Sequence, residues 1–254
     1  MKKGIKLLTK PTAQPKAEKS MSVGYATFVL HFAQYDLSGR NVCPWAGLCT
    51  LDCLGKEGRG GINAGTMDDI RARNTNKIQL ARLRRTDWFF SDRPAFLVRL
   101  RREIRNARKW AEKRGLRLAM RLNGTSDVVW ERIDPTLFVE FADVVFYDYT
   151  KAPFIVRDEL PANYSLTFSF GGDNWHNFGE SLANGRNASV VFRVKRNGAL
   201  PSTFAGLPVI DGDKTDARFL DRSGVIVGLR AKGRSIKSTS KFIVSTGRIL
   251  PVLA

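Results

Sequence analysis

The sequence predicts an α/β protein, built as a partial or complete (βα) barrel of about six parallel strands. Short apolar strands alternate with helical patterns along most of the chain, and polar residues follow several strands where they end. Continuous apolar strands are typical of parallel sheets covered by helices, because both faces of such a strand are buried. The number of strand–helix units favours a barrel over an open doubly wound sheet.

The first twenty residues are expected to be a flexible basic arm. They are polar and rich in lysine, and Pro11 and Pro15 interrupt them. Such a composition buries too little apolar surface to offset the entropy of ordering the chain. Residues 21–254 are then expected to form a single barrel-like domain that ends in a basic segment.

The expected elements follow from apolar periodicity and from capping residues. The first strand covers residues 23–32, and a helix with a Thr66–Asp69 capping pattern covers residues 66–85. A second helix begins near Asp92 and ends at Gly115. Further strands are expected at 116–124, 143–151, 164–172, 188–194, 207–213 and 224–231, with helical stretches at 127–141 (interrupted near Pro135) and 174–185.

The net charge of +18 predicts a polyanionic partner. The excess is uneven, because no acidic residue follows Asp221 while lysines and arginines accumulate. A surface of this kind attracts nucleic acid, DNA or RNA undetermined, although a merely solvated basic surface is the plainer alternative. No apolar run reaches the about 20 residues that cross a bilayer. We therefore expect a soluble protein of the cytoplasm, with no membrane partner.

Three cysteines are the most informative motif. Cys43, Cys49 and Cys53 form C-x5-C-x3-C in a loop rich in Gly and Pro. An odd number of thiols and the lack of an export signal favour metal over disulfides. Zinc wants a fourth ligand, and neither His31 nor His176 has a zinc spacing. A [4Fe–4S] cluster on three thiolates leaves one iron open, so we favour it; zinc and buried structural cysteines stay as alternatives.

Polar residues at strand ends complete the expected site, because the strands of a barrel place their carboxyl ends at one mouth. Turn chemistry alone explains any single one of them about as well. Trp45, inside the cysteine loop, is expected to shield a cluster, stack on adenine or anchor the loop. The candidate catalytic residues are Asp127, Asp148 and Lys151, and the candidate cofactor-binding residues are Trp45, Asn123, Gly171, Gly172 and Asp173.

A cysteine loop directly after the first strand resembles the radical S-adenosylmethionine (SAM) superfamily. That resemblance implies a partial (βα) barrel, SAM bound at the open iron, and cleavage of SAM to a 5′-deoxyadenosyl radical. The pair Gly171–Gly172 is similar to the glycine-rich strand end that contacts SAM in that superfamily. This chain departs from the usual C-x3-C-x2-C spacing of that superfamily.

The chain is also similar to the gene product 88 family of phage proteins. The resemblance covers residues 24–151 and rests on the cysteine loop, the Gly58–Arg59–Gly60 element, RLNGTSD at 121–127 and YDYTK at 147–151. It implies a phage origin and no assigned reaction. Walker, nucleophile-elbow, zincin and Rossmann motifs do not occur.

The leading hypothesis is a radical-SAM-like iron–sulfur enzyme that acts on, or while bound to, nucleic acid. A non-catalytic, metal-stabilised nucleic-acid-binding protein is the first alternative. A barrel enzyme that modifies a base without radicals, through an aspartate such as Asp127 or Asp148, is the second.

Overall fold

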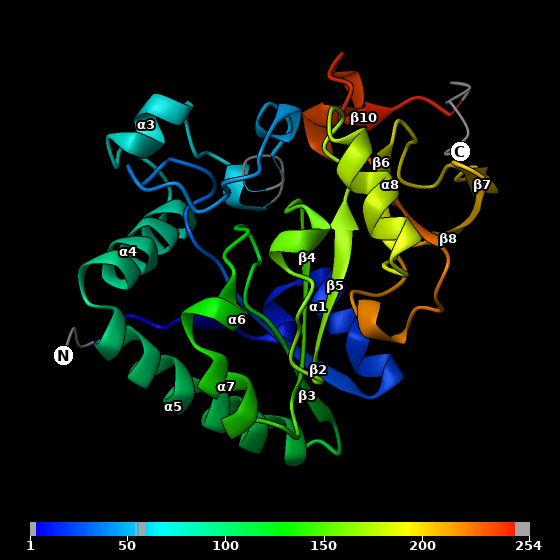
Figure 1. The fold of residues 1–254 in the computed structure, drawn as a ribbon. Coiled ribbons are helices and arrows are strands. Elements are labelled where there is room, and N and C mark those ends of the chain that lie inside the picture. The colour runs from blue at the N-terminus through cyan, green and yellow to red at the C-terminus, as the bar shows by residue number, and fades with distance from the viewer. Residues whose placement is uncertain (1–3, 54, 56–58, 247–254) are drawn as a thin grey trace.

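The computed structural model describes residues 4–53, 55 and 59–246, and its ten strands form one sheet (Figure 1). The strands are β1 (Leu8–Thr9), β2 (Tyr25–Leu30), β3 (Arg117–Arg121), β4 (Val145–Thr150), β5 (Tyr164–Ser169), β6 (Ala188–Phe192), β7 (Thr203–Phe204), β8 (Leu207–Asp211), β9 (Ile226–Arg230) and β10 (Ile243–Val244). The helices are α1 (Pro15–Lys19), α3 (Met67–Arg71), α4 (Lys77–Ser91), α5 (Arg93–Glu112), α6 (Trp130–Ile133), α7 (Pro135–Glu140) and α8 (Trp175–Ala183).

The strand order is β1-β2-β3-β4-β5-β6-β9-β8-β7, and β10 pairs with β6 outside this path. Pairing is antiparallel only at the two ends of the path, β1 with β2 and β7 with β8. All other pairs are parallel, which confirms the α/β class. Within the described residues no pairing joins β1 to β7. The sheet is therefore open, and the complete barrel is not formed.

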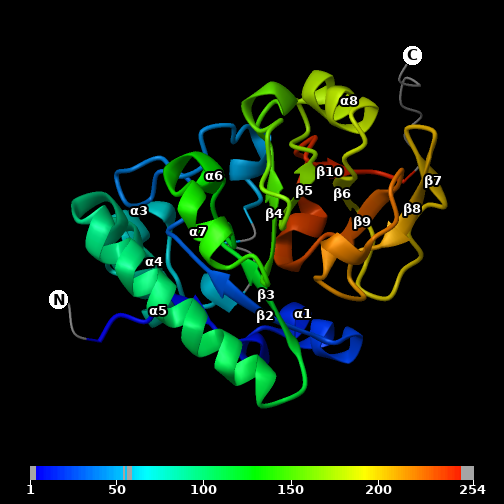
Figure 2. The same ribbon diagram turned by 60° about the horizontal axis from the view of Figure 1, so that its bottom comes forward.

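The long helix α5 and the helix α8 pack on the sheet through buried apolar clusters. Phe96, Leu100 and Ile104 of α5 pack in one buried cluster with Phe28 of β2 and Met120 of β3. A second cluster joins α8 to β5 and β6. Figure 2 shows α4 and α5 beside β2 and β3, with α8 over β5 and β6. The apolar side chains are buried because alternate residues of each strand point to this helical layer.

The N-terminal segment differs from the expected flexible arm. Residues 4–20 contain β1 and α1, and the backbone N–H groups of Leu7 and Leu8 donate to the Glu103 carboxylate at 2.9–3.1 Å. Lys16 lies 3.6 Å from Asp213. The acids that hold this basic segment lie about a hundred or more residues away in the chain, so local composition does not reveal them. Residues 1–3 lie outside the described residues.

The helix expected over residues 66–85 is two helices. The Thr66–Asp69 capping box is confirmed at the start of α3. The chain then leaves the helix at Arg73, whose φ is 64°, and Asn76 caps α4. A residue with positive φ cannot continue a right-handed helix. The interruption near Pro135 is confirmed between α6 and α7.

Asn76 provides a first test of local stability. Its side-chain carbonyl accepts from the N–H groups of Ile78 and Gln79, and its amide donates to the carbonyls of Gly60 and Ile62. Asn76→Ala should lower the free energy of unfolding by about 1–2 kcal/mol, because a helix cap and two loop contacts are lost. Asn76→Asp keeps the cap and loses only the loop contacts, so in chemical denaturation it should cost less. An equal cost for both would contradict the capping role.

Among the described residues, no helix is long and apolar enough to cross a membrane.

Candidate metal centre and adjoining pocket

The cysteine loop lies at the carboxyl edge of the parallel strands, as the sequence predicts. It follows β2, and the backbone N–H of Asp127, which comes after β3, donates to the carbonyl of Val42 at 2.8 Å. The sulfur of Cys43 lies 3.8 Å from the carbonyl oxygen of Thr125. The loop therefore sits directly against the turn that carries a candidate catalytic aspartate.

The same loop is anchored to the C-terminal segment. The Ser238 hydroxyl donates to the Asp52 carboxylate at 2.7 Å. Leu48 and Cys49 pack against a buried apolar cluster that contains Phe242 and Ile243. Residues 43–53 are thus held between the ends of the early strands and residues 231–244, which closes the site from two sides.

Helix α4 provides a third anchor, which sequence reasoning missed. The Arg82 guanidinium and the Gln79 amide both donate to the carbonyl of Gly55, at 2.9 and 3.0 Å. Both side chains are buried, and the closeness of Arg82 leaves no room for a Cβ at Gly60. Charged and amide residues on a helix are usually solvated, so their pattern in the sequence gave no signal for this role.

All three cysteines are free and half-buried. Burial raises the pKa of the Cys43 thiol to about 12 and also raises that of Cys53. Within the part of the chain that the structure describes, no three His, Cys, Asp or Glu side chains lie close enough to hold a single metal ion. The thiols gather in one region, therefore, without forming a closed mononuclear site.

Lys151 is the charged centre of this region. Burial lowers its pKa, but attraction to Cys49, Asp127, Cys43 and Cys53 outweighs burial and raises it. Its ammonium donates to the Ser169 hydroxyl at 3.0 Å, and its backbone N–H donates to the Asp127 carboxylate at 2.7 Å. The structure therefore brings the three cysteines, Asp127 and Lys151 together, as the strand-end argument predicts.

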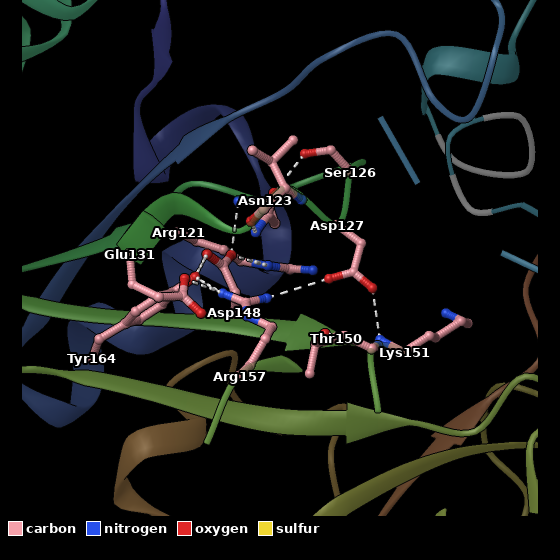
Figure 3. Close-up of polar contacts among 12 residues, drawn as sticks. Arg121, Asn123, Ser126, Asp127, Glu131, Asp148, Thr150, Lys151, Arg157 and Tyr164 are labelled. Atoms are coloured by element: carbon pink, nitrogen blue, oxygen red, sulfur yellow. Dashed lines mark hydrogen bonds and ion pairs between the residues drawn. The ribbon is translucent and has the colours of Figure 1, made fainter. Parts of the chain in front are cut away.

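Beneath them lies a buried ion-pair network (Figure 3). The fully buried Arg157 forms two hydrogen bonds of 2.7 Å with Glu131 and an ion pair of 3.3 Å with Asp127. It also donates to the Tyr164 hydroxyl at 2.9 Å. Sequence reasoning missed Arg157 and Glu131, because each lies in an unremarkable polar stretch outside the strand ends.

Asp148 belongs to this network and is fully buried. It accepts from the backbone N–H of Asn123 at 2.8 Å and from the Tyr164 hydroxyl at 2.9 Å. Burial raises its pKa to about 7. In this structure the buried Asp148 carboxyl holds the Asn123 backbone and the Tyr164 hydroxyl in place. Turn chemistry accounts for the Asn123 side chain, whose hydrogen bonds within the described part of the chain go to Ser126 and Val128.

Two of the remaining candidates line a pocket of about 320 Å³ beside the cysteine loop. Gly172 and Asp173, which follow β5, line it together with Leu48, Phe170, Trp175, Lys241 and Val244. Asp173 packs so closely on the loop that a Cβ at Gly47 would lie 2.6 Å from its carboxylate. The backbone N–H of Gly171 donates to Asn174, and Trp45 is half-buried in the loop without lining the pocket.

Comparison with known proteins identifies the family of the chain. No curated protein and no solved structure shows significant similarity to it. The family described as Gene product 88 matches residues 1–246, nearly the whole chain and well beyond residues 24–151, on which the sequence resemblance rests. The chain therefore belongs to the gene product 88 family, a family of phage proteins.

Proposed function

We propose that this protein is an iron–sulfur protein, similar to radical SAM enzymes, that acts on nucleic acid or while bound to it. Cys43, Cys49 and Cys53 would hold the cluster. The observation that carries the proposal is the placement of three half-buried thiols in one loop at the carboxyl edge of a parallel sheet, against the turn that carries Asp127. Active sites of parallel α/β proteins collect at this edge.

The chemistry of the donor set fits such a group. Buried thiols with raised pKa values are neutral unless a cationic centre displaces their protons, and a cluster on thiolates does so. A cubane cluster distributes its cysteines over different irons, so its ligands stand farther apart than those of one zinc ion. The absence of a tight three-donor group among the described residues thus disfavours zinc more than a cluster.

When bound, such a cluster supplies electron transfer and one iron without a protein ligand. Lys151 offers a cation for a carboxylate or phosphate beside it. Asp127 holds the backbone of Lys151, and Arg157 holds Asp127, so the network below orients that ammonium. SAM remains the predicted cofactor, on the strength of the superfamily resemblance.

The charge distribution supports a nucleic-acid partner. Four arginines of α5 form ion pairs with acids: Arg99, Arg101, Arg105 and Arg108. Other exposed cations have no described acid as ion-pair partner, both on α5, at Arg93, Arg102 and Lys109, and beyond β6, at Lys195, Arg196, Lys237 and Lys241. Of these, Lys241 lines the pocket, so we propose a phosphate contact there.

Among the alternatives, the base-modifying enzyme that uses Asp148 as nucleophile is disfavoured by the burial of Asp148. The alternative of a non-catalytic, metal-stabilised binding protein predicts the same phosphate contacts, but its metal would be structural and need not be an iron–sulfur cluster. Metal content therefore separates it from our proposal.

The test is metal and acid-labile sulfide analysis after anaerobic purification. We expect iron and sulfide in similar amounts, a brown colour, and loss of both when any one cysteine is replaced, as in Cys49→Ser. Leu51→Ser changes an exposed residue of the same loop and should keep the iron. One equivalent of zinc without iron, or iron that survives all three cysteine substitutions, would overturn the cluster.

A further inference from the structure

The pocket beside the cysteine loop is built from segments far apart in the chain. Leu48 comes from the loop, Gly172 and Asp173 follow β5, Trp175 opens α8, and Lys241 and Val244 come from the C-terminal segment. Gly172 has a φ of 98°, and a Cβ there would lie 2.5 Å from the backbone nitrogen of Phe242. Because no side chain fits between these walls, the C-terminal segment closes directly over the strand end.

The walls combine three kinds of chemistry. Phe170 and Trp175 form an aromatic floor, with ring centroids 4.4 Å apart. Trp175 also packs on Phe178 and Phe204, which fixes the plane of its indole. The exposed Asp173 adds a carboxylate, which only accepts hydrogen bonds when ionised, and the exposed Lys241 adds an ammonium, which only donates.

We propose that this pocket takes one amino-bearing nucleobase from a single-stranded nucleic acid, stacked on Trp175 with its amino edge toward Asp173 and its phosphate toward Lys241. The inference rests on the nucleic-acid partner of the proposed function and names the part of that partner which enters the site. Aromatic side chains stack on bases whatever their sequence, and lysine binds phosphate as a point charge. Adenine, cytosine and guanine carry an exocyclic amino group for Asp173, and thymine and uracil do not.

Size and charge favour this occupant over others. A volume of about 320 Å³ is near the lower end of ligand pockets, and a base that enters such a pocket must leave its duplex or come from a single strand. The wall at Lys241 belongs to a segment in which no acid follows Asp221. That wall attracts a polyanion, and the Asp173 carboxylate of the same pocket provides an acceptor for the amino edge of a base.

The experiment compares single-stranded oligonucleotides on the full-length, anaerobically purified protein by fluorescence anisotropy. Wild type should bind a cytosine or adenine oligonucleotide about tenfold more tightly than the same strand with abasic sites. Trp175→Ala should remove that difference, and Trp175→Phe should keep most of it. Phe90→Ala, which removes a partly exposed aromatic of α4, should leave the difference unchanged.

Two conservative variants keep the inference testable even if Trp175→Ala fails to fold. Asp173→Asn changes an exposed carboxylate and should reduce the preference for cytosine over thymine. Lys241→Gln should weaken base-bearing and abasic strands alike and lower the salt slope of binding by about one, as expected for one lost phosphate contact.

Three results would overturn the inference. Equal binding of base-bearing and abasic strands would show that no base enters the pocket, while the proposed nucleic-acid function would stand. If SAM displaced the oligonucleotide from wild type but not from Trp175→Ala, the pocket would be a cofactor pocket and not a base pocket. No oligonucleotide binding at low salt would overturn both the inference and the nucleic-acid part of the proposed function.

Discussion

Replacing Arg157 with methionine should destabilise the protein by about 3–5 kcal/mol, the range observed when one partner of a buried ion pair is removed. The Arg157 side chain has no exposed surface and neutralises Glu131 and Asp127. Methionine fills a similar volume but leaves two buried carboxylates without a cation and the Tyr164 hydroxyl without one of its donors. The measurement is the free energy of unfolding by chemical denaturation at neutral pH.

The matched control for Arg157→Met is Arg108→Met. Arg108 also pairs with an aspartate, Asp143, at 3.2 Å, but 38% of its side chain is exposed. Because exposed ion pairs contribute little, this variant should lose less than about 1 kcal/mol. The double variant Arg157→Met/Glu131→Gln should regain part of the stability, since one unpaired charge is removed. Equal losses for Arg157→Met and Arg108→Met would refute the role of burial.

The second large effect concerns pH and Asp148. Its pKa is raised to about 7 in the folded protein by burial, against about 3.9 in an unfolded chain. Between these values the folded state keeps a proton that the unfolded state has released, so stability falls as pH rises. The stabilisation is complete below about pH 4 and is lost through pH 7, for a total of about 4 kcal/mol.

Asp148→Asn isolates this contribution. The amide does not titrate and can still accept from the Asn123 N–H. Subtracting the variant's unfolding free energies from those of wild type at each pH should give a difference that declines from pH 4 to pH 7 and is flat above. The subtraction removes the contributions of other acids, such as Asp134 and Asp216, whose pKa values are lowered. A difference independent of pH would contradict a protonated Asp148.

Local sequence patterns predicted the ends of several helices well, but they did not predict contacts between segments that are far apart in the chain. The capping residues Thr66 and Asp92 and the break at Pro135 act over a few residues, so the sequence displays them directly. Whether the sheet closes depends instead on strands that are distant in sequence: β9 and β8 extend it beyond β6 and leave it open, which no local pattern encodes. β1 and α1 escaped prediction for the same reason, because Glu103 and Asp213 order them from afar.

The candidate site shows the same division. The rule that parallel strands end at one edge was enough to bring Asp127 and Lys151 to the cysteine loop. That rule does not distinguish an accessible group from a buried one. It therefore assigned Asp148 and Asn123 to the expected site, whereas both side chains are buried and bond to other groups of the protein. The roles of Arg157, Arg82 and Gln79 could not be predicted, because the identity of a polar residue does not reveal whether it is buried or solvated.

The contact between Asp52 and Ser238 spans 186 positions of the chain, and it sets the timing of assembly. During synthesis, at roughly 5–20 residues per second, the cysteines leave the ribosome long before residues 231–244 exist. In that interval the thiols lack one of the walls that bury them in the finished protein. The proposed cluster is thus expected to load after the last wall has been translated, and the thiols are open to oxidation before that moment.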